Sequence, residues 1–255
     1  MRTRIRTGTT LAVLAAIPVA LLVALPSPAA AGRTSKPKTW TWSFQADTLG
    51  REPQHAAVFG GRWEVALDGS AVAGSVPPAA PAAAAGAADS SASDSAVAAS
   101  VPRVLRRAAA ADDDGEEEFH YLQFKKPIVE DLIASVRFRI VSGDIDPTAG
   151  LLVQLDSKKG KNGYLLRVSG EKNRLIAHYL LHGKRRDLRH AEIPPLEPGV
   201  WHTLSIARKG SVMTASYDGV EKFRVRDERF RKGTVGLWTE DDTIVEFADL
   251  TVSTN

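Results

Sequence analysis

The C-terminal part of the sequence reads Trp201-His-Thr-Leu-Ser-Ile206, then Val212-Met-Thr-Ala-Ser-Tyr217, Lys222-Phe-Arg-Val-Arg226, Gly233-Thr-Val-Gly-Leu-Trp-Thr239 and Thr243-Ile-Val-Glu-Phe-Ala-Asp-Leu-Thr-Val252. Apolar and polar residues largely alternate in these short stretches, as expected for strands with one buried face. Asp218-Gly219 separates the second stretch from the third. This dipeptide favours a tight hairpin turn, because both central residues of that turn need a positive φ. The segment therefore predicts a meander of antiparallel strands.

The same period of two continues upstream of this segment. Residues 132–140 carry apolar side chains at every even position, with Ser135, Arg137 and Arg139 between them. Further strands are expected at 150–155, 164–168 and 175–181, separated by turn-forming residues. Many short antiparallel strands with regular turns predict an all-β fold, a two-sheet antiparallel β-sandwich of the jelly-roll type.

The N-terminus has the composition of an export signal. Arg2, Arg4 and Arg6 precede an apolar stretch at 11–25, and small residues follow at 29–31. This order predicts a signal peptide over residues 1–31 and a secreted, extracytoplasmic protein. The apolar stretch is shorter than the roughly 20 residues of a membrane span, so no membrane span is expected after signal cleavage.

The charge balance changes when this segment is removed. The chain has 33 Lys and Arg against 30 Asp and Glu, and residues 1–31 hold three arginines and no acid, which leaves 30 against 30. The overall charge therefore indicates no nucleic-acid or anionic-membrane partner. The sequence has no cysteine, so stability must come from burial without disulfides.

Residues 32–255 are predicted to form a single domain that a low-complexity insert at about 69–118 interrupts. The insert is rich in Ala, Ser, Pro and Gly and ends in the acidic run Asp112-Asp-Asp-Gly-Glu-Glu-Glu118. Such a composition cannot bury enough apolar surface to offset its chain entropy, which predicts a disordered loop. Residues 63–67 and 103–106 have strand-like patterns, and we expect them to be strands of one sheet.

Six pieces in one order carry a resemblance to a known group: 142–152, 162–167, 183–185, 201–204, 217–219 and 233–239. They resemble the concanavalin A-like jelly-roll domains of the 3-keto-disaccharide hydrolase group, also described as glycoside-hydrolase-like or laminin-G-like. The resemblance covers about 42–252 apart from the insert. It implies two antiparallel sheets with a concave face, secretion, and a connection to saccharides.

The candidate catalytic carboxylates are Glu240, Asp242 and Glu246, which would all point to the same side of one strand. Jelly-roll glucanases of the laminarinase type carry E-x-D-x-x-E or E-x-D-x-E on one strand, and retaining hydrolysis needs two carboxyls about 5 Å apart. The gap from Asp242 to Glu246 is longer than either pattern allows. A charged, solvated turn is the alternative reading of these residues.

Calcium is the inorganic ligand that the sequence suggests. Asp144 and Asp146 flank Ile145 in a loop bounded by Gly and Pro, and carboxylates at alternate positions suit this cation. An Asx-type turn explains the same residues without metal, and no metal site is expected.

Saccharide binding needs aromatic faces for stacking and a few fixed polar groups that orient hydroxyls. The candidates are Trp238, Tyr164, Arg167, Arg137, Tyr179, Lys184 and Arg185. Trp238 and Leu237 are adjacent on a strand, so only one of the two faces the core. Lys184-Arg-Arg186 is a basic hairpin tip, which either is a solvated turn or attaches to an anionic polysaccharide.

Three functions are compatible with the sequence. The preferred hypothesis is a secreted jelly-roll domain that contacts carbohydrate with weak or absent catalysis. The first alternative is an active glycoside or 3-keto-disaccharide hydrolase. The second alternative is a structural or adhesive exported domain.

Overall fold

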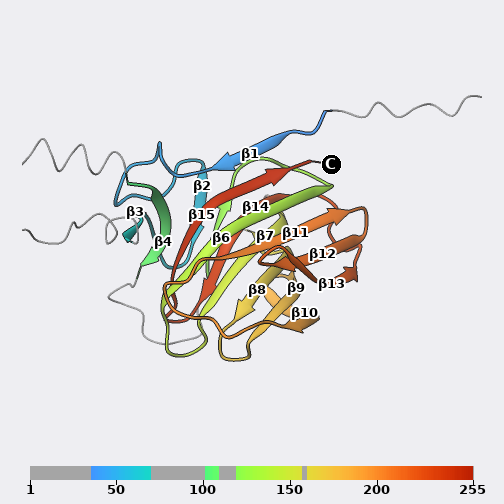
Figure 1. The fold of residues 1–255 in the computed structure, drawn as a ribbon. Coiled ribbons are helices and arrows are strands. Elements are labelled where there is room, and N and C mark those ends of the chain that lie inside the picture. The colour runs from blue at the N-terminus through green and yellow to red at the C-terminus, as the bar shows by residue number, and fades with distance from the viewer. Residues whose placement is uncertain (1–35, 70–100, 109–118, 157–159, 255) are drawn as a thin grey trace, which may run out of the picture. The chain divides into compact units, whose positions relative to one another are not determined.

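The computed structural model describes residues 36–69, 101–108, 119–156 and 160–254 (Figure 1). The described residues from Pro37 onward belong to one compact unit. The predicted signal peptide at 1–31, and the insert residues 70–100 and 109–118, lie outside the described residues.

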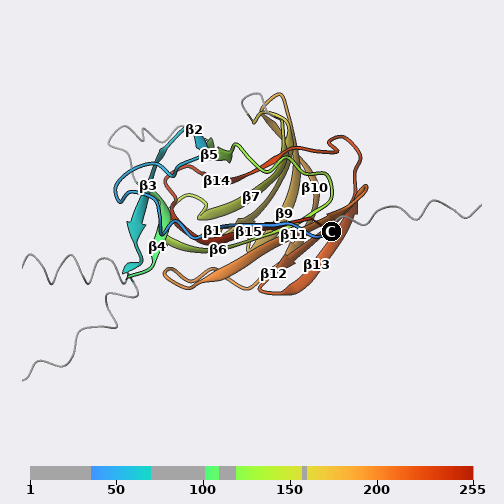
Figure 2. The same cartoon turned by 90° about the horizontal axis from the view of Figure 1, so that it is seen from above.

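The described residues form two antiparallel sheets, and Figure 2 shows them as two layers. One sheet has eight strands in the order β13-β12-β11-β6-β15-β4-β3, with β1 also paired to β15, and the other has seven in the order β10-β9-β8-β7-β14-β5-β2. The strands are β1 (Thr39–Trp42), β2 (Ala56–Phe59), β3 (Arg62–Leu67), β4 (Arg103–Ala108), β5 (Phe119–Phe124), β6 (Leu132–Ser142), β7 (Thr148–Leu155), β8 (Gly163–Ser169), β9 (Arg174–Leu181), β10 (Lys184–Glu192), β11 (His202–Lys209), β12 (Val212–Tyr217), β13 (Val220–Arg226), β14 (Thr234–Glu240) and β15 (Ile244–Ser253). The predicted all-β, two-sheet architecture is confirmed.

The local sequence signals act as expected. In β6 the five even-numbered apolar residues from Leu132 to Ile140 are all buried, whereas Ile133 between them is 42% exposed. The β12–β13 hairpin turns at Asp218 and Gly219, whose φ angles are +48° and +77°. Asp218 also accepts a hydrogen bond from the backbone N–H of Thr203, which ties this turn to β11.

The two sheets enclose one large apolar core, which includes Leu105, Phe138, Leu151, Leu166, Leu237 and Phe247. A second, smaller apolar cluster consists of Leu152, Leu155, Leu165, Leu180 and Trp238, with Tyr121 packed against it. Its members alternate along β7, β8 and β14 with residues of the large core, so the second cluster lies on the opposite face of the seven-stranded sheet. We call this face, turned away from the eight-stranded sheet, the outer face.

Strands β3 and β4 pair with each other from Arg62–Ala108 to Leu67–Arg103, as predicted for residues 63–67 and 103–106. Strand β4 therefore lies inside the range of about 69–118 that was predicted as one low-complexity insert. The backbone N–H of Asp68 donates to the carbonyl of Pro102 at 2.7 Å. The two ends of the inserted segment are therefore adjacent. No helix in the described part of the chain has the length and hydropathy of a membrane span.

Candidate functional site on the outer face of the seven-stranded sheet

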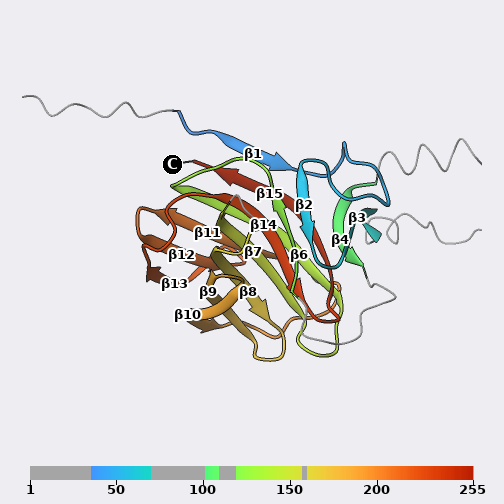
Figure 3. The same cartoon turned by 180° about the vertical axis from the view of Figure 1, so that it is seen from behind.

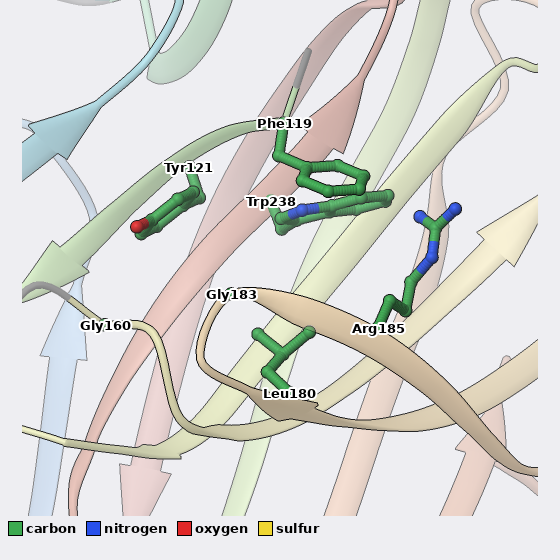
Figure 4. A pocket seen from close by; sticks show the side chains of 7 residues that line it. All are labelled: Phe119, Tyr121, Gly160, Leu180, Gly183, Arg185 and Trp238. Atoms are coloured by element: carbon green, nitrogen blue, oxygen red, sulfur yellow. The ribbon is translucent and has the colours of Figure 1, made fainter. Parts of the chain in front are cut away.

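A hollow opens on the outer face, between β5, β14 and the β9–β10 hairpin (Figure 4). Its lining residues are Phe119, Tyr121, Gly160, Leu180, Gly183, Arg185 and Trp238. Apolar side chains form most of this surface, and Arg185 is its one charged lining group. The hollow therefore combines ring surfaces with a cation at its margin.

Strand register determines which aromatic side chains are neighbours in this region. Trp238 lies opposite Tyr121 in the β14–β5 pair, and Tyr121 lies opposite Phe59 in the β5–β2 pair. Phe59 and Tyr121 stack with ring centroids 5.1 Å apart, and Phe119 lies over Trp238 at 5.8 Å (Figure 4). Phe119 is 36% exposed and Trp238 only 2%. Phe119 and the half-buried Tyr121 thus offer accessible ring surface, and Trp238 supports them from below.

Glu240, at the end of β14, is the centre of a charged network beside these rings. Its Oε1 accepts a hydrogen bond from Arg167 at 2.6 Å, and its Oε2 accepts one from Arg185 at 2.5 Å. The Arg185 guanidinium also lies 5.1 Å from the Phe119 ring centroid and 5.4 Å from that of Trp238. Such cation–π contacts favour a fixed position for the guanidinium above the rings.

Asp146 extends the network away from the hollow. Nη1 of Arg167 donates to Asp146 at 3.1 Å as well as to Glu240, so one guanidinium nitrogen joins two carboxylates. Asp146 also accepts hydrogen bonds from the Ser169 hydroxyl and from the backbone N–H of Glu171. Both of its oxygens therefore have protein partners.

His178 on β9 is a buried member of the same network. Its Nε2 accepts a hydrogen bond from Nε–H of Arg167 at 3.3 Å, and its Nδ1 lies 2.8 Å from the carboxylate of Asp187. The imidazole is 2% exposed. Burial, together with the charges of Arg167 and Arg185, lowers the pKa of His178 to about 3, although Asp187 acts in the opposite direction. The ring is therefore neutral, and accepting at Nε2 places its proton on Nδ1, facing Asp187.

The phenol of Tyr121 has a shifted acidity as well. Burial, and to a smaller extent the charge of Asp156, raise the pKa of Tyr121. The Tyr121 hydroxyl consequently stays protonated at neutral pH.

Three of the seven predicted binding residues come together on the outer face: Trp238, Arg167 and Arg185. Of these, only Arg185 and Trp238 line the hollow. Trp238 does not present an open stacking face, because Phe119 covers it.

The other four predicted binding residues lie elsewhere. Arg137 is on β6 of the other sheet, paired with Asp249 and packed on Trp201. Tyr164 belongs to the large core and donates its hydroxyl to Asp227. Tyr179 packs against the same core. Lys184 is exposed on β10, opposite Leu181.

The structure also separates the three candidate catalytic carboxylates. Glu240 is the last residue of β14 in the seven-stranded sheet, whereas Glu246 is buried in β15 of the other sheet, where Arg106 and Arg139 donate to it. Asp242 lies in the turn between these strands and accepts hydrogen bonds from the backbone N–H groups of Asp144 and Ile145. Shared parity does not bring the trio together, because the chain passes from one sheet to the other between Glu240 and Ile244.

Asp144 and Asp146 do not face a common centre. Asp144 is exposed, while Asp146 is buried and bonded to Arg167 and Ser169. The loop that holds them is fixed by Asp242. Among the residues that the structure describes, no group of three His, Asp or Glu side chains could hold a metal ion.

Phe119, Tyr121, His178 and Asp187 were not among the predicted site residues. Strand parity places Phe119 and Tyr121 on one face of β5, and this signal is present in the sequence. That this face adjoins Trp238 depends on the pairing of β5 with β14, more than a hundred residues further along the chain. His178 and Asp187 meet only through the β9–β10 register.

No protein-family model matches the sequence, and no curated protein matches it. Among solved structures, the chain is similar to the carbohydrate-binding module CBM66 from Bacillus subtilis, with 18% identity, a TM-score of 0.50, and coverage of 57% of this chain and 84% of that one. It is also similar to a Bacillus subtilis protein with a galectin-like fold (11% identity, TM-score 0.45, 59% and 81% covered) and to a Bacillus licheniformis β-glucanase (9% identity, TM-score 0.45, 60% and 78% covered). The likeness to the CBM66 module, together with the two antiparallel sheets, confirms the predicted concanavalin A-like jelly roll.

Proposed function

We propose that this domain binds a saccharide in the hollow of the outer face, outside the cytoplasm, with weak or absent catalysis. The observation that carries the proposal is the exposed ring of Phe119, with Tyr121 beside it and the Arg185–Glu240 pair at the margin. Aromatic rings stack on the apolar C–H faces of sugars, and fixed polar groups orient the hydroxyls. The extracytoplasmic location rests on the signal-peptide pattern of residues 1–31.

The hydrogen bonds of the carboxylates favour binding over hydrolysis. A glycosidase needs one carboxylic acid that donates a proton and a second carboxylate that acts as nucleophile or base. Both oxygens of Glu240 accept hydrogen bonds from arginine, and both oxygens of Asp146 have protein partners. In this arrangement the two carboxylates hold the arginines in place.

The fold is compatible with this proposal. The CBM66 module is named as a carbohydrate-binding module, and its likeness to this chain concerns the scaffold. Because one scaffold can host unrelated functions, the argument for saccharide binding stays with the hollow.

The test is retention on immobilised neutral polysaccharides, followed by calorimetric titration with the glycan that retains the wild type. Phe119→Ala should weaken binding roughly fivefold to tenfold, because an aromatic stacking contact contributes about 1 kcal/mol. Ile133→Ala is the matched control, since it removes an exposed apolar side chain from the other sheet, and it should leave the affinity unchanged.

Two outcomes would contradict the proposal. Release of sugar from a glycoside or a 3-keto-disaccharide, lost in Glu240→Gln, would establish the hydrolase instead. Absence of both retention and turnover across a broad glycan panel would favour a structural or adhesive domain.

A further inference from the structure

Basic side chains border the sandwich where β10 and β13 lie beside each other (Figures 1 and 3). Each of these strands is the last of its sheet, so together they close one side of the sandwich. β10 contains four basic residues (Lys or Arg) and two acidic residues (Asp or Glu), and β13 contains three basic residues and one acidic residue. The two strands together have seven basic and three acidic residues. Residues 32–255 as a whole carry 30 of each, so the remaining part holds 23 basic and 27 acidic residues. Positive charge is thus concentrated at this side, which we call the basic edge.

Several of these cations have no anionic partner within the described part of the chain. Lys184, Arg186 and Arg189 on β10 are exposed, and none of them forms an ion pair or a side-chain hydrogen bond with another described residue. Lys222 on β13 is half-buried and also has no such partner among the described residues. By contrast, Arg224 is paired with Glu221. Three unpaired cations therefore occupy six residues of one edge strand.

Register places the three β10 cations on one side of the strand. Lys184, Arg186 and Arg189 lie opposite Leu181, Tyr179 and Ala177, and the last two of these pack against the large core. The three cations thus point toward the side on which β13 lies. Arg229, which follows β13 and is paired with Asp227, places its guanidinium 4.1 Å from the ring centroid of Tyr179. Tyr179 is the cross-strand partner of Arg186, so this contact links the segment after β13 to the strand next to β10.

Charge on an edge strand also prevents pairing with another chain, and lysine is often used in this way. A few charges are enough for that purpose, whereas Lys184, Arg186 and Arg189 are three unpaired like charges on one side of one strand, where they repel one another. A bound polyanion would offset this repulsion, and a row of cations along an extended strand suits a linear polymer.

We propose that the basic edge binds a linear anionic polysaccharide that carries uronate carboxylates or sulfate groups. The choice of a saccharide over another polyanion rests on the proposed function, because β10 also supplies Arg185 to the hollow. Residues 184, 186 and 189 lie on one side of β10 and Arg185 on the other. A glycan that crosses this edge strand therefore reaches both the basic edge and the hollow.

The test compares polygalacturonate and dextran sulfate with uncharged dextran, by affinity electrophoresis and titration. The triple variant Lys184→Gln/Arg186→Gln/Arg189→Gln should bind the polyanions at least about tenfold more weakly than the wild type, because it removes three charge contacts. Wild-type binding should weaken as salt increases. The two polyanions distinguish carboxylate from sulfate recognition.

The matched control removes the same charge from the opposite side of the sandwich. Arg51, Lys125 and Lys126 are exposed; Lys125 and Lys126 follow β5, and the Arg51 carbonyl accepts a hydrogen bond from Val65 of β3. Arg51→Gln/Lys125→Gln/Lys126→Gln should change polyanion affinity by less than about twofold. Melting curves show whether each variant folds. Should the triple variant unfold, the single variants Lys184→Gln and Arg189→Gln provide the same test, each with a smaller expected loss of affinity.

Four results would overturn the proposal. One is unchanged polyanion affinity in the folded β10 variant, and another is an equal loss in the control. A third is a new dimer formed by the β10 variant without loss of binding, which would assign the charges to edge protection alone. The fourth is tighter binding of duplex DNA than of either polysaccharide at matched salt. Retention of neutral glycans, and its loss in Phe119→Ala, is scored separately, so failure of the hollow and failure of the basic edge are distinguishable.

Discussion

Acidification should destabilise this domain through one buried histidine. In the folded state, burial and the charges of Arg167 and Arg185 lower the pKa of His178 to about 3. In the unfolded chain its pKa returns to about 6.5. Between these two values the unfolded state binds a proton that the folded state does not. Stability therefore decreases as the pH falls below about 6.5, and above that pH this histidine contributes no pH dependence.

The size of the effect follows from the two pKa values. Relative to about pH 8, protonation of His178 in the unfolded chain should cost about 2 kcal/mol of unfolding free energy at about pH 5. Because the imidazole is only 2% exposed, solvent screening reduces this figure little. For a domain of this size, the loss corresponds to a decrease in melting temperature of roughly 4–8 °C.

Urea unfolding curves between about pH 5 and about pH 8 measure this dependence, with His178→Gln as the comparison. A glutamine at this position can accept from Arg167 and donate to Asp187, but it does not titrate. The pH dependence of the wild type should exceed that of the variant by about 2 kcal/mol over this range. Parallel curves for the two proteins, or an NMR titration of the His178 ring near its ordinary pKa, would refute the reasoning.

Three further predictions concern stability, and all are measured by chemical denaturation. Glu246→Gln should lower the free energy of unfolding by about 3–5 kcal/mol, because it leaves Arg106 and Arg139 without their buried carboxylate. Asp249→Asn, which breaks an exposed ion pair with Arg137, should lower it by at most about 1 kcal/mol. Gly236→Ala should cost about 3 kcal/mol, because its Cβ would lie 2.3 Å from the Leu122 carbonyl oxygen. Replacing residues 70–100 with a four-residue Gly/Ser turn should stabilise the domain by about 1–2 kcal/mol, because a shorter loop between the adjacent ends of β3 and β4 costs less closure entropy.

The fold could be predicted from the sequence because its signals are local. The even-numbered residues of β6 alternate with polar ones, and Asp218-Gly219 adopts the positive φ angles that this hairpin turn requires. Each signal spans only a few residues, so no knowledge of distant contacts is needed to interpret it. The pairing of 63–67 with 103–106 across the insert was predictable for the same reason, since both stretches show strand-like patterns.

The candidate site was predictable only in part, because it depends on contacts between distant strands. Trp238, Arg167 and Arg185 were identified by residue type, and the sheet order β10-β9-β8-β7-β14-β5 brings them to one face. The prediction that Arg137 belongs to the binding site was wrong, because Arg137 lies in the other sheet. Alternation along a strand shows which side of the strand a residue occupies and does not show to which sheet the strand belongs. Trp238 alternates correctly with Leu237, but only the structure shows that Phe119 covers it.

The buried charges beneath the hollow explain how Arg185 can serve as a fixed binding group. Burying a charged group costs several kcal/mol of desolvation free energy, so the ion pairs of Arg167 with Glu240 and Asp146 contribute little net stability to the sheet. The network does constrain geometry, because Glu240 is held by Arg167 and in turn holds Arg185 over the Phe119 ring. A guanidinium that is already in position loses little side-chain entropy when a ligand binds. Glu240→Gln should therefore weaken binding of neutral glycans in the hollow and leave polyanion binding at Lys184, Arg186 and Arg189 largely unchanged.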